Sequence, residues 1–77
     1  RQPLRPEPTE LNALLAGMAD MLERALRADI RLALHPAGAP AWVELDAAQM
    51  RTALINLAVN ARDAMPRGGT LAVRLHH

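Results

Sequence analysis

The spacing of apolar residues predicts two helices. Between residues 9 and 27, apolar side chains recur three and four positions apart, which is the period of a helix with one buried face. Thr9 is the expected N-cap of this helix. A second helix is predicted over residues 46–65, where Asp46 precedes Gln49 by three positions as in a capping box and Pro66 ends the pattern. The apolar positions of the first helix are Leu11, Leu14, Leu15, Met18, Met21, Leu22, Ala25 and Leu26.

Alternation of apolar and polar residues predicts strands between and after the helices. Two short strands are expected within residues 30–45, separated by the turn sequence AGAP, and another over residues 70–75. Residues 1–8 hold three prolines, so they are expected to form an extended arm or an edge strand. The strand residues expected to share an apolar side are Ile30, Leu32 and Leu34, then Val43 and Leu45, then Leu71, Val73 and Leu75.

This order of elements predicts an α/β (α+β) fold. Each helix and each strand has one apolar face, and the simplest way to bury those faces is a two-layer sandwich with two helices on a small mixed or antiparallel sheet. The chain has 77 residues and a single aromatic residue, Trp42, so the core is expected to be thin. Partners or further chain are therefore expected to cover the open edges of the sheet.

Composition excludes several classes of function. The net charge is +1, and nine arginines are scattered among eight acidic residues, which does not predict a nucleic-acid partner. Cys, Ser, Lys, Tyr and Phe are absent, which excludes disulfides, cysteine metal sites, serine or cysteine nucleophiles and Schiff-base lysines within this chain. No apolar run approaches the ~20 residues that a membrane-spanning helix needs, so a soluble chain is expected.

The two ends suggest a piece of a longer protein. The first residue is Arg rather than Met, and the last two are His76 and His77. We interpret the chain as an excised piece and leave open whether these histidines are native or part of a purification tag.

The second helix carries a polar stripe within the sequence LINLAVNARDAM. At 100° per residue, Asn56, Asn60 and Asp63 fall within about 60° of one another, between apolar flanks. The apolar residues expected to hold this helix against the sheet are Leu54, Leu57, Ala58 and Ala61. One interpretation is the solvent face of an amphipathic helix. Solvent faces usually carry Glu, Lys, Arg or Gln, however, whereas Asn is a poor helix former. The second interpretation is a row of oxygen ligands for a hard cation such as Mg²⁺, which is usually held by one or two protein groups together with substrate phosphates.

The same stretch resembles the N-box of the histidine kinase ATP-binding domain, a GHKL (HATPase_c) domain with the Bergerat-type ATPase fold. The resemblance extends over almost the whole chain, through RPEPTELNALLAGMADMLERAL, IRLALHP, VELDAAQM and GGTLAVRL. It implies that residues 1–77 are the N-terminal part of that domain in a two-component sensor histidine kinase. Such a parent binds ATP with Mg²⁺ and transfers the γ-phosphoryl group to a histidine of its own dimerisation domain, and then to a response regulator. The resemblance also implies a cytoplasmic domain, and attachment of the parent to the inner membrane is left open.

The resemblance also implies roles for the stripe. Asn60 matches the Mg²⁺-coordinating asparagine, and Asn56 and Asp63 match positions near the nucleotide phosphates, so these three are the expected cofactor-binding residues. No catalytic residue is assigned. An amide such as Asn56 cannot act as a general base, which favours phosphoryl transfer over hydrolysis. A hydrolytic ATPase or a serine kinase of the same group is the alternative. Arg62, about 120° from Asn56, is expected to be a solvated charge.

Other parts of that family's site are missing from this sequence. The Asp-x-Gly-x-Gly box of the adenine pocket, the glycine-rich box, the lid and the phosphoacceptor histidine are not present. Gly68 and Gly69 are interpreted as a turn, and His35 as a surface residue. The isolated chain is therefore expected to bind nucleotide weakly or not at all. A different hypothesis is an interaction module that forms homodimers, for example by strand exchange at an open edge.

Overall fold

The computed structural model describes residues 4–75; His76, His77 and the first three residues of the predicted arm lie outside the described residues. The elements are β1 (Glu7–Glu10), α1 (Leu11–Ala25), β2 (Ile30–His35), β3 (Trp42–Leu45), α2 (Ala47–Ala64) and β4 (Gly69–Arg74). The two helices and the small set of strands confirm the predicted α/β class. The end of the proline-containing arm forms β1.

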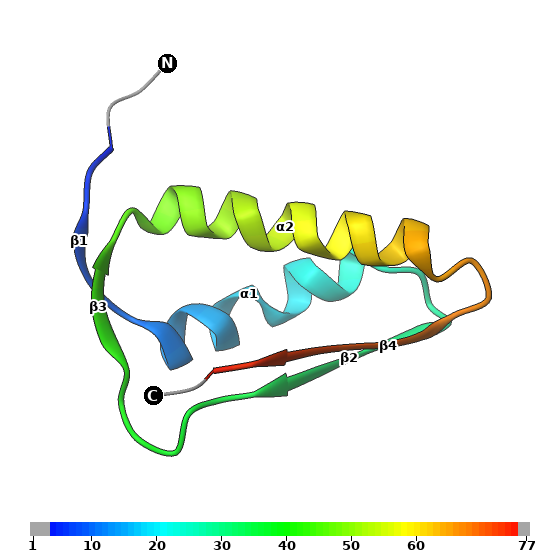
Figure 1. The fold of residues 1–77 in the computed structure, drawn as a ribbon, viewed down its shortest axis with the longest axis horizontal. Helices are drawn as coiled ribbons and strands as arrows, with labels where there is room; N and C mark the ends of the chain where they lie inside the picture. The colour runs from blue at the N-terminus through cyan, green and yellow to red at the C-terminus, as the bar shows by residue number, and fades with distance from the viewer. Residues whose placement is uncertain (1–3, 76–77) are drawn as a thin grey trace.

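The four strands form two separate pairs. β2 and β4 are parallel, with Ile30 opposite Gly69, and β1 and β3 are antiparallel, with Thr9 opposite Val43. Figure 1 shows the β1–β3 pair at one end of the helices and the β2–β4 pair along their length. Alternation along a strand indicates which face it buries but not which strand it pairs with, so this division could not be predicted.

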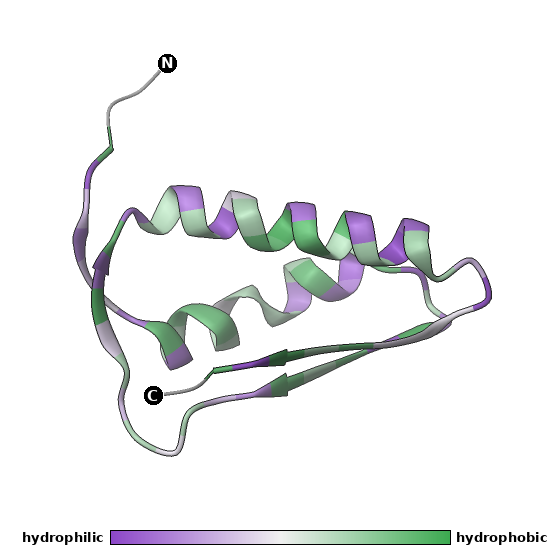
Figure 2. Cartoon of the chain, in the orientation of Figure 1, coloured by the Kyte–Doolittle hydropathy of each residue, from purple (hydrophilic) through white to green (hydrophobic). Residues whose placement is uncertain are grey.

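The helices lie side by side and run in the same direction, on one side of the β2–β4 pair (Figure 1). The molecule is a slab of 38 × 35 × 17 Å. Its core is one cluster of buried side chains, to which both helices and β2 contribute: Leu15, Met18, Leu22, Leu26, Ile30 and Ala58. Figure 2 shows hydrophilic positions along the side of α2 that faces away from this cluster.

Some predicted core residues are exposed. Val43 is 40% exposed, because β3 pairs with β1 beyond the ends of the helices rather than beneath them. Met21 and Leu57 are 51% and 45% exposed. Each lies at the margin of its helix's apolar face, outside the contact between the helices and the β2–β4 pair. In contrast, Ala58 is 0% exposed.

The helix starts are capped by carboxylates. Thr9 was the expected cap of α1, and this is wrong: Thr9 lies in β1, and its hydroxyl donates to the Glu7 carbonyl (3.0 Å). Glu10 is the cap, and its carboxylate accepts from the backbone N–H groups of Asn12 (3.2 Å) and Ala13 (2.9 Å). Asp46 caps α2 as predicted, accepting from the Gln49 N–H at 3.1 Å.

Both capping carboxylates also accept a hydrogen bond from a distant segment. The Ala41 N–H donates to Glu10 (2.7 Å), and the Arg5 N–H donates to Asp46 (3.0 Å). The Ala41 N–H makes the largest contribution to lowering the pKa of the Glu10 carboxyl. The Arg5 N–H does the same for the pKa of Asp46, with help from Gln49. Each carboxylate thus joins a helix start to another part of the chain.

Within residues 4–75, none of the helices combines the length and the apolar character that crossing a membrane would require.

Candidate functional site

The polar stripe predicted on α2 is present as a continuous exposed row. Asn56, Asn60 and Asp63 are all exposed and lie on the last three turns of the helix. The residue buried most deeply on α2 is Ala58. At 100° per residue, Asn56 and Asn60 each point about 160° away from it. The helix therefore presents the three oxygen-bearing side chains to solvent while its opposite face packs on α1.

The side chains of the stripe have few partners within the described chain. Asp63 forms an ion pair with Arg62 (Oδ1 to Nε, 3.4 Å), and 69% of its side chain is exposed. Within residues 4–75, the side-chain amides of Asn56 and Asn60 neither donate nor accept a hydrogen bond that the structure describes. Their amide oxygens are therefore available to an external ligand.

The donor set of the stripe suits a cation that shares its coordination with a phosphate. Among residues 4–75, no three His, Asp or Glu side chains gather as they would in a metal site built wholly from protein. The stripe offers two amide oxygens and a carboxylate on successive turns. Mg²⁺ keeps several waters and is commonly held by one or two protein oxygens and substrate phosphates. The oxygen atoms of the stripe therefore fit a Mg²⁺ ion that is also bound to phosphate.

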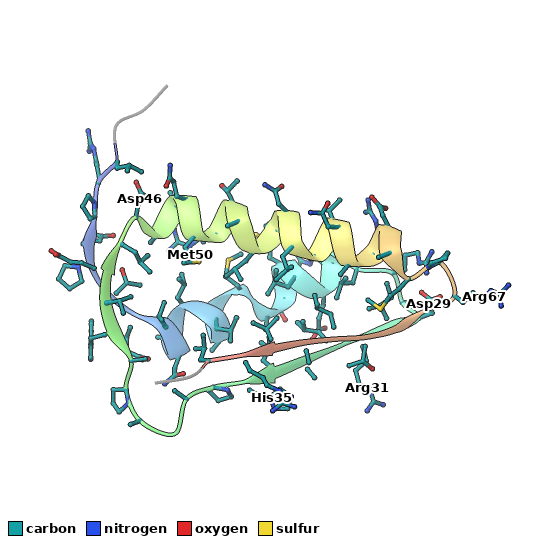
Figure 3. All side chains as sticks on the ribbon, in the orientation of Figure 1. Asp29, Arg31, His35, Asp46, Met50 and Arg67 are labelled. Carbon is teal, nitrogen blue, oxygen red and sulfur yellow. The ribbon has the colours of Figure 1, made fainter. Side chains whose placement is uncertain are left out.

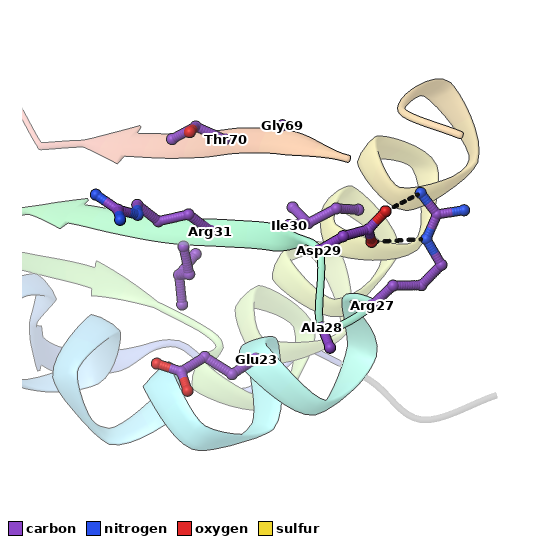
Figure 4. Close-up of a pocket in the computed structure, with 9 residues that line it drawn as sticks. Glu23, Arg27, Ala28, Asp29, Ile30, Arg31, Gly69 and Thr70 are labelled. Carbon is purple, nitrogen blue, oxygen red and sulfur yellow. Dashed lines mark hydrogen bonds and ion pairs between the residues drawn. The ribbon is translucent and has the colours of Figure 1, made fainter. Parts of the chain in front are cut away.

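The hollows described on the surface lie elsewhere. A depression of about 760 Å³ lies beside the start of β2 and β4, where Arg27 and Asp29 form an ion pair (dashed lines in Figure 4). A smaller apolar cavity of about 100 Å³ lies between the helices and β4, and is lined by Leu11, Leu14, Leu15, Met50, Leu54, Val73 and Leu75. None of the stripe residues lines either of these two hollows.

Arg62 has a role that the sequence prediction missed. Its side chain is 38% exposed, in line with the expected solvated charge. Its Nη1 also donates to the Ala25 carbonyl at the end of α1 (3.5 Å), a contact that was not predicted. Arg62 follows Ala58 by four positions and therefore lies on the side of α2 that packs on α1. The four-residue spacing from Ala58 could have indicated this contact only if the relative position of the two helices had been known.

Two other residues lie as expected. Gly68 has a φ of +86° and its N–H donates to the Met65 carbonyl (3.0 Å), so it closes the turn that follows α2, and Gly69 begins β4. His35 is exposed at the end of β2, and Figure 3 shows it pointing away from the helices with Arg31.

The chain is similar to a segment of a known sensor kinase. No protein-family model matches it. The protein described as Sensor kinase CckA, from Brucella abortus (strain 2308), is 44% identical over 75 residues. The match covers 96% of this chain and 8% of that protein, so the chain spans less than a tenth of the length of the curated relative it matches.

Proposed function

We propose that the chain is part of the ATP-binding domain of a sensor histidine kinase, and that α2 supplies the N-box side chains that hold Mg²⁺ and the phosphates of ATP. The observation that carries the proposal is the stripe: Asn56, Asn60 and Asp63 share one exposed side of α2. Its support is the 44% identity, over almost the whole chain, to a segment of a sensor kinase.

The three residues divide the contacts to Mg-ATP. The Asn60 amide oxygen would hold the metal ion, whose charge neutralises the phosphates when it is bound. Asn56, one turn earlier, would donate from its amide NH₂ to a phosphate oxygen. Asp63, one turn after Asn60, would contact waters of the metal ion. Asn56 cannot take a proton from water, so the site favours transfer to a protein histidine over hydrolysis; a hydrolytic ATPase or a serine kinase of the same group is the alternative.

In the parent protein this site would act with other domains. The γ-phosphoryl group would pass to a histidine of the kinase's own dimerisation domain and then to an aspartate of a response regulator. The proposed place of this domain is the cytoplasm, with membrane attachment, if any, supplied by other parts of the parent.

The full-length kinase allows a direct test of the metal ligand. Asn60→Ala should weaken the binding of a non-hydrolysable ATP analogue with Mg²⁺ by about tenfold or more, since it removes a metal ligand. The measurement is isothermal titration calorimetry. Gln49→Ala is the matched control, because it removes an exposed amide from the same side of α2 about three turns earlier. An Asn60→Ala affinity equal to that of the control would refute the assignment.

The isolated 77-residue chain should bind the same analogue far more weakly than the full-length kinase. Its stripe is exposed and none of the described hollows adjoins it, so the base and ribose would make few contacts. Micromolar affinity in calorimetry would contradict the view that the rest of the pocket lies elsewhere in the parent.

A second candidate function, self-association of the isolated chain, is favoured by the strand pairing. Among the described residues, β2 and β4 pair only with each other, which leaves an unpaired edge on each strand. Two-stranded sheets are seldom stable alone, and unpaired edges can accept a strand from another copy. We expect a dimer in size-exclusion chromatography with light scattering at micromolar concentration. A monomer under those conditions would argue strongly against strand exchange.

A further inference from the structure

The C-terminal ends of the two helices lie next to each other. α1 and α2 run in the same direction, so their last turns meet at one end of the slab (Figure 1). The end of a helix carries a partial negative charge on carbonyl groups that have no partner within the helix. Two such ends side by side repel each other, and arginine side chains can offset this by donating to the carbonyls.

One arginine reaches from α2 to the end of α1. The Arg62 guanidinium donates from Nη1 to the Ala25 carbonyl (3.5 Å), and its Nε pairs with the Asp63 carboxylate (3.4 Å). Arg62 thus contacts both the neighbouring helix and a residue of the proposed phosphate site.

A second arginine reaches in the opposite direction. Arg27 lies two residues beyond the end of α1. Its Nη2 donates to the carbonyl of Met65, which is the C-cap residue of α2. Its guanidinium is held in place by the Asp29 carboxylate, with Nε to Oδ1 at 3.2 Å and Nη2 to Oδ2 at 3.4 Å (Figure 4). The end of α1 therefore accepts a hydrogen bond from Arg62 of α2, and the end of α2 accepts one from Arg27, which follows α1.

The backbone closes the same junction. The Gly69 N–H donates to the Asp29 carbonyl (3.2 Å), and a Cβ placed on Gly68 would lie 2.5 Å from that oxygen. The end of α2 is thus fixed against the start of β2 on two sides. Asn60 and Asp63 lie within the last two turns of α2, immediately before this junction.

We propose that Arg62 and Arg27 are positioning residues for the metal contacts of α2. By bonding the two helix ends to each other, they fix the rotation of the last turns of α2 and hence the direction in which Asn60 and Asp63 point. This inference rests on the proposed function.

The test compares nucleotide binding by the full-length kinase with and without Mg²⁺. Calorimetry with a non-hydrolysable ATP analogue is done once with Mg²⁺ and once with EDTA, and the ratio of the two affinities measures the metal-dependent gain. Arg62→Met should reduce that gain by about tenfold, as loss of a residue that orients a metal ligand typically does, and should leave the metal-free affinity unchanged. Arg62→Lys should recover part of the gain, because it retains a cationic donor.

Two further variants keep the outcome decisive. Arg51→Met removes an exposed arginine from the first half of α2 and should leave both affinities unchanged. Arg27→Met removes the hydrogen bond from the end of α1 to the Met65 carbonyl and should also lower the metal-dependent gain. This variant replaces Arg62→Met if Arg62→Met does not fold.

An equal loss of affinity with and without Mg²⁺, or no loss in either arginine variant, would overturn the proposal. Failure of the proposed function itself is seen separately. If Asn60→Ala leaves the metal-dependent gain intact, then α2 does not hold the metal, whatever the arginine variants do.

Discussion

At the scale of single residues, the capping carboxylates show what local sequence can and cannot predict. Asp46 was predicted because its capping partner, Gln49, is three positions away. Glu10 was missed in favour of Thr9. The choice between them depends on the pairing of Thr9 with Val43 and on the Ala41 N–H, both more than thirty residues away. The stripe of Asn56, Asn60 and Asp63 was predicted from helical angle alone, whereas the contact of Arg62 with Ala25 depends on how two helices pack.

The two capping carboxylates should make stability depend on pH in the acid range. Backbone N–H groups lower the pKa of Glu10 and of Asp46 in the folded chain. Their stabilisation is therefore complete above the ordinary values of about 4.3 and 3.9, and is lost as the pH falls through the lower folded values. Urea midpoints measured between pH 7 and pH 3 should decrease mainly below about pH 4.5.

The double variant Glu10→Gln, Asp46→Asn separates this effect from other titrations. It removes both charges and keeps an oxygen acceptor at each helix start. The decrease in urea midpoint towards low pH should become shallower than in the wild type. Superimposable curves for the two proteins would contradict the role given to these carboxylates.

At the scale of elements, the pattern of the sequence predicts the helices and strands better than their partners. Periodicity is a local property, so α1, α2, β2 and β4 all fall where it indicates. Pairing is set by burial and chain geometry over longer distances. β3 shows the limit, because its apolar Val43 was assigned to the core and instead lies exposed in the β1–β3 pair.

The turn between α2 and β4 should tolerate only glycine at position 68. Gly68 has a φ of +86°, and a Cβ there would lie 2.5 Å from the Asp29 carbonyl oxygen. Gly68→Ala should lower the free energy of unfolding by at least about 1 kcal/mol. Chemical denaturation followed by circular dichroism measures the change.

Gly17→Ala is the matched comparison and should have the opposite sign. Gly17 is exposed within α1, and a Cβ there would meet no atom within 4 Å. Alanine is the better helix former by about 0.5–1 kcal/mol, so stability should rise. A stabilising Gly68→Ala or a destabilising Gly17→Ala would show that the backbone of these segments differs from that described.

At the scale of the whole molecule, a single small core carries the stability. The slab is 17 Å thick, and one buried cluster joins both helices to β2. Chains of this size rarely gain more than about 3–5 kcal/mol from one core. The loss of one central side chain is therefore a large fraction of the total.

Leu22→Ala should unfold most of the population of the isolated chain. Leu22 is 1% exposed, and truncation of such a residue costs about 2–5 kcal/mol. Its neighbour Met21 is 51% exposed, so Met21→Ala should change stability by less than about 0.5 kcal/mol. Thermal melts of the two variants give the comparison, and similar midpoints would mean that the buried cluster does not dominate stability.

The parallel pairing of β2 with β4 also sets an order of events during synthesis. Ile30 lies opposite Gly69, so β2 has no strand to pair with until the ribosome has added a further 39 residues. At about 5–20 residues per second, the ribosome takes about 2–8 s to make that interval. Throughout this time β2 has α1 beside it but no strand to pair with. The nascent chain is therefore most vulnerable to aggregation just before β4 emerges.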